Sequence, residues 1–263
     1  MVKWHWPTVR MLGYATGMNI PTLWFKTLHR ILPALLMAAA FNQAQAVTPI
    51  DPFSLKFQVT RNGTVLGVNN VQLEQSKPGV WDFSGAIVGT DGLAMLAGAT
   101  VNERSILTAP KGAWEIYSSS LETKVAWRRD LKTIARQKDG AGYLYKDHKK
   151  SVVIPYQPGL LDQHSVTLAL ISDLQAGKGP TFKYQTIVKG KVETYTFRIA
   201  GEQVLDTALG RMDAVKVERV RQTDNGKSTV IWFARNKNYL PVKFQDLNAK
   251  GDTIDMKIIA INP

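Results

Sequence analysis

Residues 182–199 read FKYQTIVKGKVETYTFRI, two strand-like runs on either side of Lys189-Gly190. In the second run, Tyr195, Phe197 and Ile199 alternate with threonine and arginine. Alternation with period two places apolar side chains on one face of a strand and polar side chains on the other. A two-residue turn with glycine tolerates the positive φ angles of a tight hairpin. This stretch therefore predicts an antiparallel β-hairpin with one buried face.

The same pattern recurs towards both ends of the chain. Apolar and polar residues alternate over 55–60 and 253–258, and Arg61-Asn62-Gly63 and Asn225-Gly226 supply further turn signals. We count about ten to twelve strands without β-α-β alternation, which predicts an all-β, mostly antiparallel fold. A sheet of this size curls or closes, so we expect a strongly curved sheet or barrel. Pro241 lacks an N–H and predicts a sheet edge or a bulge.

One segment, Asp162–Ala176, departs from the strand pattern. Its apolar residues, Leu170 and Leu174 among them, recur at helical spacing, and either its first residue or Ser165 can cap its start. We expect one amphipathic helix that acts as a lid over the mouth or one face of the sheet. A second short helix is predicted around Leu93–Ala97.

The N-terminal region carries the features of an export signal. Residues 31–41 form an apolar run that follows Lys26 and Arg30 and precedes Ala44-Gln45-Ala46. The run is too short to span a bilayer, which takes about 20 helical residues. A basic start, a short apolar middle and an A-x-A end are typical of a secretory signal peptide. A buried core helix is the alternative interpretation.

The predicted cleavage site lies between Ala46 and Val47. Translation from Met18 gives a leader of the usual length, so we favour Met18 as the true start. Residues 47–263 then form a single β-rich domain, which we expect to be soluble in the periplasm of a Gram-negative bacterium.

Composition narrows the possible chemistry. The 263 residues include 33 Lys+Arg, 21 Asp+Glu and no cysteine, for a formal net charge of +12. The absence of cysteine excludes a disulfide scaffold, a thiol nucleophile and a Cys-ligated metal site. His148 and His164 are the only histidines after residue 46, so we expect no metal site and no cofactor.

Asp162, His164 and Ser165 bring the three residue types of a catalytic triad into four positions. Triads are built from side chains that converge, whereas these three diverge from the start of one helix. We interpret them as capping residues and assign no catalytic residue.

Carboxylates offer another route to catalysis. Glu103, Glu115, Glu122 and Glu193 lie in or beside predicted strands, and glycosidases use pairs of carboxylates. The spacing singles out no pair, so these residues read as exposed strand charges.

Lysine and arginine concentrate in Lys124–Lys138. No recognition motif accompanies the charge, so we expect no nucleic-acid partner. A basic strand face can contact anionic lipid headgroups, and a solvated face is the alternative. Membrane contact is at most peripheral.

Large apolar side chains are spread over the predicted strands and helix. They form a filled core or, if the barrel is incompletely filled, they line a hydrophobic cavity. The residues expected to line such a cavity are Tyr195, Phe197, Trp232 and Phe244 on strands and Leu170 and Leu174 on the helix.

Several short motifs follow one another in order between residues 52 and 261. They include Asp162-x-x-Ser165, Tyr195-x-Phe197-x-Ile199, Trp232-Phe233-Ala234 and Leu240-Pro241-Val242-Lys243. On these motifs the chain resembles the bacterial family DUF3108, a domain of unknown function. The resemblance implies an exported β-rich protein of Gram-negative bacteria, similar in outline to barrel-like periplasmic proteins. It implies no activity, ligand or catalytic residue.

Three hypotheses about function remain open. The first is non-catalytic binding or carriage of a hydrophobic or amphiphilic, lipid-like ligand in the curved sheet. The second is a structural or partner-binding envelope protein with a filled core and an exposed edge strand at Leu240–Phe244. The third is a carboxylate-based hydrolase. The sequence leaves the oligomeric state open.

Overall fold

The computed structural model describes residues 50–223 and 226–262, which all belong to one compact unit, Gln43–Pro263. The predicted leader, its cleavage between Ala46 and Val47, and the start at Met18 lie outside the described residues.

The described residues form one antiparallel sheet of fourteen strands, which confirms the predicted all-β class and exceeds the estimated strand number. In space the strands follow the order β8-β7-β6-β5-β4-β3-β2-β1-β14-β13-β12-β11-β10-β9. Their bounds are β1 (Phe53–Arg61), β2 (Thr64–Lys77), β3 (Val80–Gly89), β4 (Thr100–Thr108), β5 (Glu115–Val125), β6 (Arg128–Arg136), β7 (Gly142–Lys146), β8 (Ser151–Pro155), β9 (Thr181–Val188), β10 (Lys191–Thr207), β11 (Gly210–Val220), β12 (Ser228–Ala234), β13 (Leu240–Leu247) and β14 (Thr253–Asn262). The remaining elements are α1 (Gly92–Leu96), α2 (Val166–Gln175) and two short 3₁₀ turns, η1 (Pro110–Gly112) and η2 (Arg235–Lys237).

Two of the predicted turns form where the sequence places them, whereas Asn225 of the Asn225-Gly226 turn lies outside the described residues. Asn62 and Gly63 have φ angles of 50° and 81° and join β1 to β2. Lys189 and Gly190, at 49° and 73°, join β9 to β10. Both residues of each loop thus adopt the left-handed conformation that a two-residue hairpin requires.

Pro241 lies at a bulge. The register between β12 and β13 shifts from Trp232↔Lys243 to Phe233↔Pro241, so Val242 is the extra residue. Because β13 lies between β12 and β14, the prediction of an exposed edge at Leu240–Phe244 is wrong. The edge strands are β8 and β9.

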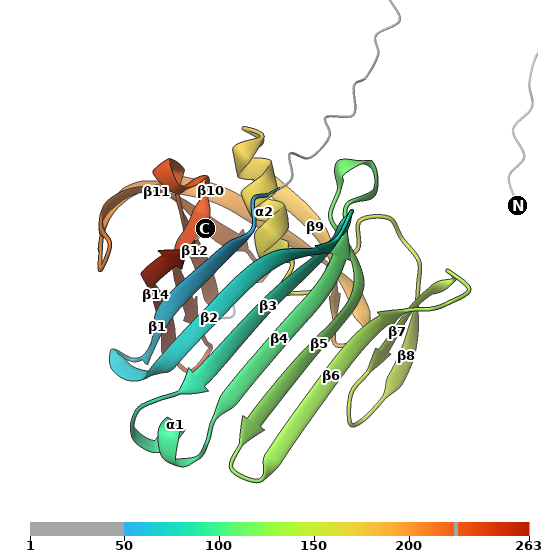
Figure 1. The fold of residues 1–263 in the computed structure, drawn as a ribbon, viewed down its shortest axis with the longest axis horizontal. Helices are drawn as coiled ribbons and strands as arrows, with labels where there is room; N and C mark the ends of the chain where they lie inside the picture. The colour runs from blue at the N-terminus through green and yellow to red at the C-terminus, as the bar shows by residue number, and fades with distance from the viewer. Residues whose placement is uncertain (1–49, 224–225, 263) are drawn as a thin grey trace, which may run out of the picture. The chain divides into compact units, whose positions relative to one another are not determined.

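Helix α2 occupies the concave side of the sheet. Figure 1 shows it behind β1–β3 and in front of the strands at the back of the curve. It packs into the main core, and seven of its ten residues are buried, Leu170 and Leu174 included. The predicted helix is therefore present, and it is buried more completely than an amphipathic lid requires.

The connection between β8 and α2 lies between β5 and the edge strand β9 and bonds to both strands. Ile116 of β5 donates its backbone N–H to the carbonyl of Leu160, at 2.9 Å. Leu161 donates to Gln185 of β9 at 3.0 Å and accepts from Ile187 at 2.8 Å. We call this pair, Leu160 and Leu161, the seam. The sheet thus closes into a barrel through two backbone residues of a loop.

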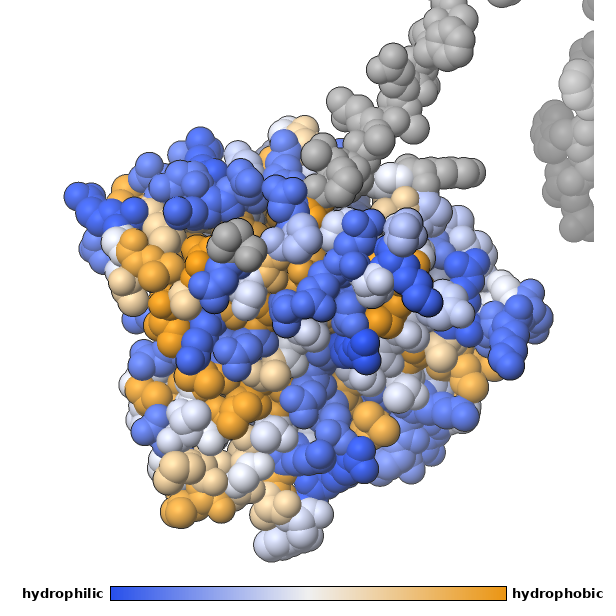
Figure 2. Space-filling view, viewed as in Figure 1, coloured by the Kyte–Doolittle hydropathy of each residue, from blue (hydrophilic) through white to orange (hydrophobic). Residues whose placement is uncertain are grey.

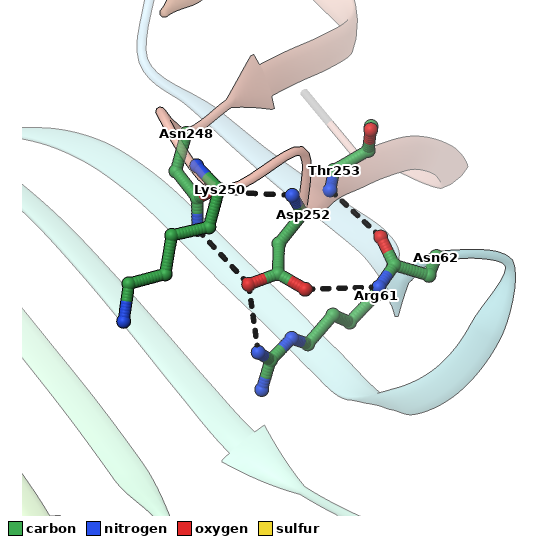
Figure 3. A network of polar contacts seen from close by, with 6 residues as sticks. All are labelled: Arg61, Asn62, Asn248, Lys250, Asp252 and Thr253. Carbon is green, nitrogen blue, oxygen red and sulfur yellow. Dashed lines mark hydrogen bonds and ion pairs between the residues drawn. The ribbon is translucent and has the colours of Figure 1, made fainter.

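Because successive strands run in opposite directions, alternate turns gather at the same end of the barrel. The turns β1–β2, β3–β4 with α1, β5–β6, β7–β8, β9–β10 and β13–β14 share the end that we call the α1 end. Two of them are joined there by side chains, as Figure 3 shows: Asp252 accepts hydrogen bonds from Arg61 at 2.9 Å and from Asn62 at 3.0 Å.

Candidate functional site

Two adjoining cavities remain inside the barrel beside the start of α2. The first, of about 210 Å³, lies against Phe57, Phe83, Phe244 and Met256, and we call it the aromatic chamber. Its polar lining residues are Asn69, Glu103, Gln163, His164 and Thr167. An apolar wall with a few convergent polar groups is the usual construction of a small-molecule site.

The second cavity, of about 200 Å³, we call the lysine chamber, after Lys132 and Lys189 in its lining. Tyr145 also lines it and donates to Asp147 at 2.8 Å. Burial, followed by this hydrogen bond, raises the pKa of Tyr145 to about 12, so its phenol stays protonated at neutral pH. The chamber also holds the carboxylates of Glu103 and Asp162, so its lining carries charges of both signs.

Glu103, Gln163 and His164 line both chambers and mark their boundary. The His164 ring stacks on Phe83 with centroids 4.0 Å apart and an interplanar angle of 12°. Its Nε2 lies 4.0 Å from Glu103 Oε2, and its buried Nδ1 has no hydrogen-bond partner among the described residues. Gly85 makes room for the ring, since a Cβ there would lie 3.3 Å from His164 Nε2.

Asn69 places a second unpaired polar atom at the aromatic chamber. The residue is only 8% exposed, and its buried Oδ1 has no hydrogen-bond partner among the described residues. Its amide group makes one weak contact, with Met256 Sδ at 3.5 Å. A buried acceptor without a donor costs about 1–3 kcal/mol, so the molecule keeps Asn69 at the expense of stability.

The three residues of triad type do not converge. Asp162 Oδ1 accepts from the backbone N–H of Ser165 at 2.7 Å, and Oδ2 accepts from Ser105 at 2.6 Å. Ser165 Oγ accepts from the Asp162 backbone N–H at 3.1 Å. Asp162 and Ser165 therefore fix the start of α2, while His164 lies against Glu103.

The predicted strand glutamates have separate surroundings. Glu115 is buried and accepts from Arg136 at 2.8 Å, Tyr156 at 3.1 Å and the backbone of Gly159 at 3.0 Å. Glu122 is paired with Lys124 and Arg129. Glu193, by contrast, is exposed. Of these glutamates, only Glu103 lines either chamber.

The six predicted ligand-lining residues fall into three groups. Phe244 lines the aromatic chamber. Tyr195, Phe197, Leu170 and Leu174 are buried in the core around α2, where Gln163 donates to the Tyr195 hydroxyl at 2.8 Å. Trp232 packs with Lys216 and Lys243 over its ring and donates to Gln203 at 3.0 Å. A direct ligand contact for any of the six remains a prediction.

The sequence held a signal for Asn69 that went unused. In residues 65–73 the alternation places position 69 in phase with Val71 and Leu73, which are buried. A polar residue in the inward phase of a strand is an anomaly that suggests a site. The pairing of Glu103 with His164 left no such signal, because it depends on how β4 lies beside the start of α2.

A third, larger cleft of about 550 Å³ lies at the other end of the barrel, between Ile50–Phe53, η2 and the end of β14.

Metal-binding groups and membrane-spanning helices are both missing from the part of the chain that the structure describes. Residues 50–223 and 226–262 contain no group of three His, Cys, Asp or Glu side chains that could hold a metal ion. In the same ranges, no helix has the length and apolar character needed to cross a membrane.

A family profile described as "Protein of unknown function (DUF3108)" matches residues 56–258. No curated protein matches the chain. Among solved structures, the chain is similar to a beta-barrel-like protein of domain of unknown function DUF1849 from Brucella abortus, at 9% identity and a TM-score of 0.51. The match covers 80% of this chain and 97% of that chain, and it supports the barrel-like fold alone.

Weaker similarity extends to MucB. A structure of MucB matches at 14% identity and a TM-score of 0.34, over 84% of this chain and 56% of that chain. The Pseudomonas aeruginosa MucA/MucB complex matches at 16% identity and a TM-score of 0.28, over 80% of this chain and 51% of that chain. The chain thus spans about half the length of the MucB chains.

Proposed function

The chain belongs to the DUF3108 family, and we propose that it is a non-catalytic binding protein for a short amphiphilic ligand held in the aromatic and lysine chambers. The observation that carries the proposal is the unpaired Oδ1 of Asn69, buried at the aromatic chamber. A ligand that donates a hydrogen bond to this atom removes the free-energy cost of leaving a buried acceptor unpaired in the empty protein.

The volumes limit the apolar part of the ligand. An apolar cavity of about 150 Å³ admits benzene, so the aromatic chamber, at about 210 Å³, suits one ring or a short alkyl chain. A long acyl chain needs more room, and α2 already fills the adjacent core. We therefore narrow the lipid-like ligand of the first hypothesis to a short amphiphile.

The charged and polar side chains that line the two chambers indicate the polar groups of the ligand. Lys189 lines the lysine chamber and makes no ion pair among the described residues, whereas Lys132 pairs with Asp130 at 2.9 Å. Lys189 therefore favours an anionic group, while Asn69 favours a hydroxyl donor beside the apolar part. A short hydroxylated carboxylic acid combines both features.

Calorimetric titration with 3-hydroxyoctanoate, octanoate and palmitate tests the proposal. We expect 3-hydroxyoctanoate to bind roughly fivefold more tightly than octanoate, because one hydrogen bond to a buried acceptor is worth about 1 kcal/mol. Palmitate should bind more weakly than either, since its chain exceeds the chamber.

The variant Asn69→Leu supplies the decisive comparison. It should abolish the preference for the hydroxylated acid and raise the free energy of unfolding by about 1 kcal/mol, because an unpaired buried acceptor is removed. Asn70→Leu, on the exposed face of the same strand, is the matched control and should keep the preference. Absence of binding by both short acids, or an unchanged preference in Asn69→Leu, would refute the proposal.

A further inference from the structure

A second surface stands out at the α1 end. Helix α1 has no buried residue, and Leu93 and Leu96 are 83% and 77% exposed. Met95 is exposed as well. Large apolar side chains in a solvated helix indicate a contact that the isolated chain does not make.

The neighbouring β5–β6 turn carries further apolar side chains. Trp127 is 90% exposed and Val125 is also exposed. The backbone N–H of Ala126 donates to the carbonyl of Ala97 at 2.7 Å, which ties this turn to the end of α1. The apolar residues of the two connections therefore form one surface, which we call the rim patch: Leu93, Met95, Leu96, Val125 and Trp127.

The backbone holds the rim patch in place. Thr90 and Asp91 donate their N–H groups to the carbonyl of Leu66, and Gly89 donates to Ala99. A Cβ at Gly89 would lie 2.7 Å from the Ala94 backbone, so only glycine lets α1 pack this closely on the strand ends. The exposed side chains thus project from an anchored support.

Cations lie beside the rim patch and at the same end of the barrel. Lys124, Arg128 and Arg129 flank Trp127, while Lys146 ends β7 and Lys149 and Lys150 follow it in the β7–β8 turn. Within residues 89–99, 124–129 and 146–151, the acids are Asp91 and Asp147. Glu122 on β5 pairs with Lys124 and Arg129, which leaves the surplus positive. Figure 2 shows hydrophobic atoms gathered over α1 beside a hydrophilic surface over the adjacent strands.

We propose that the rim patch docks the protein on an anionic lipid surface, with the apolar tips in the interface and the cations at the headgroups. Trp127 suits this position because tryptophan combines a large apolar ring with an N–H that remains hydrated. The apolar residues lie on projecting connections within a basic surround, an arrangement typical of interfacial membrane binding. This inference concerns the outer surface and does not depend on the proposed ligand.

Vesicle flotation tests the inference. The full-length chain is expressed, and the protein is purified with whatever processing the cell has performed on it. Its mass is determined first. We expect it to float with vesicles of equimolar phosphatidylcholine and phosphatidylglycerol and to bind phosphatidylcholine alone at least tenfold more weakly. Salt at roughly 0.5 M should weaken the binding, because it screens surface charge.

The combined variant Leu93→Ser, Leu96→Ser, Trp127→Ser should lose at least tenfold in affinity for the anionic vesicles, and Arg128→Gln should lose a smaller factor. Leu209→Ser, at the opposite end of the barrel and also exposed, is the matched control and should bind as the parent does. Circular dichroism establishes that each variant is folded. The proposal is overturned if the parent does not bind anionic vesicles, or if the combined variant binds them equally well. Failure to bind vesicles, together with a dimer in gel filtration that the combined variant abolishes, would assign the rim patch to a second copy instead.

Discussion

At the scale of single residues, Asp252 in the β13–β14 turn accepts hydrogen bonds from three side chains. Hydrogen bonds from Asn62, Asn248 and Arg61 hold the pKa of Asp252 at about 2. The folded state therefore binds its proton less readily than the unfolded chain, whose aspartate has a pKa near 3.9. The resulting stabilisation is complete above about pH 4 and is lost as the pH falls through about 2.

We therefore predict a pH-dependent effect of Asp252→Asn. The variant should unfold at lower urea concentration than the parent at about pH 7, and the difference should shrink from about pH 4 towards pH 2. Urea titrations of both proteins across this pH range measure the difference in unfolding midpoint. Asp206→Asn, at a side chain that is 91% exposed, is the control and should show little difference at any pH. A deficit in Asp252→Asn that stays constant down to pH 2 would contradict the assignment.

Residue alternation predicted much of the interior correctly and missed its exceptions. Phe57, Tyr195 and Phe197 are buried as the alternation predicts. Trp232 follows the same rule locally, yet it shares its sheet face with Lys216 and Lys243. Both faces of β12 are covered, and this depends on tertiary packing that a single strand does not encode.

At the scale of elements, the start of α2 depends on Asp162. This carboxylate binds the Ser165 backbone and the Ser105 hydroxyl, which joins the helix to β4. We predict that Asp162→Ala lowers the free energy of unfolding by about 2–3 kcal/mol, because the Ser165 backbone N–H and the buried Ser105 hydroxyl both lose their acceptor. Urea unfolding measures the change, with Asp213→Ala at an exposed strand position as control. Parent-like stability in Asp162→Ala would show that the helix start is held by packing alone.

The elements themselves were predicted with uneven success. The helix predicted over Asp162–Ala176 forms over Val166–Gln175, and the short helix predicted around Leu93–Ala97 forms as α1. The bounds of β4 leave little signal in the sequence, because Asn102-Glu103-Arg104 puts polar residues on both faces of the strand. Alternation is the main sequence signal of a half-buried strand, so such a strand is inconspicuous.

At the scale of the whole molecule, closure of the barrel depends on a loop that the sequence does not mark. The seam works through backbone groups, which leave no side-chain pattern. Glu115 holds the residues that lead into the seam. Its carboxylate accepts hydrogen bonds from the Tyr156 hydroxyl and from the backbone N–H of Gly159, just before Leu160. Burial of Glu115 beside Arg136 makes this contact sensitive to loss of charge.

We predict that Glu115→Gln lowers the free energy of unfolding by roughly 2 kcal/mol and loosens the seam. Hydrogen exchange by NMR should show faster exchange at the amides of Leu161 and Ile187, while amides in the β2–β3 ladder keep their rates. Uniform acceleration across the sheet would mean that Glu115 supports global stability and has no particular role at the seam.

The sheet order also governs when the fold can be completed. Strand β1 pairs with β14, from Ser54↔Asn262 to Arg61↔Ile254, so the first and the last described strands lie side by side. Contacts between such distant parts of a chain form late, because a long loop must close first. During synthesis β14 emerges after the other thirteen strands, and until then β1 has one unpaired side. The architecture therefore makes completion of the sheet wait for the last of its fourteen strands.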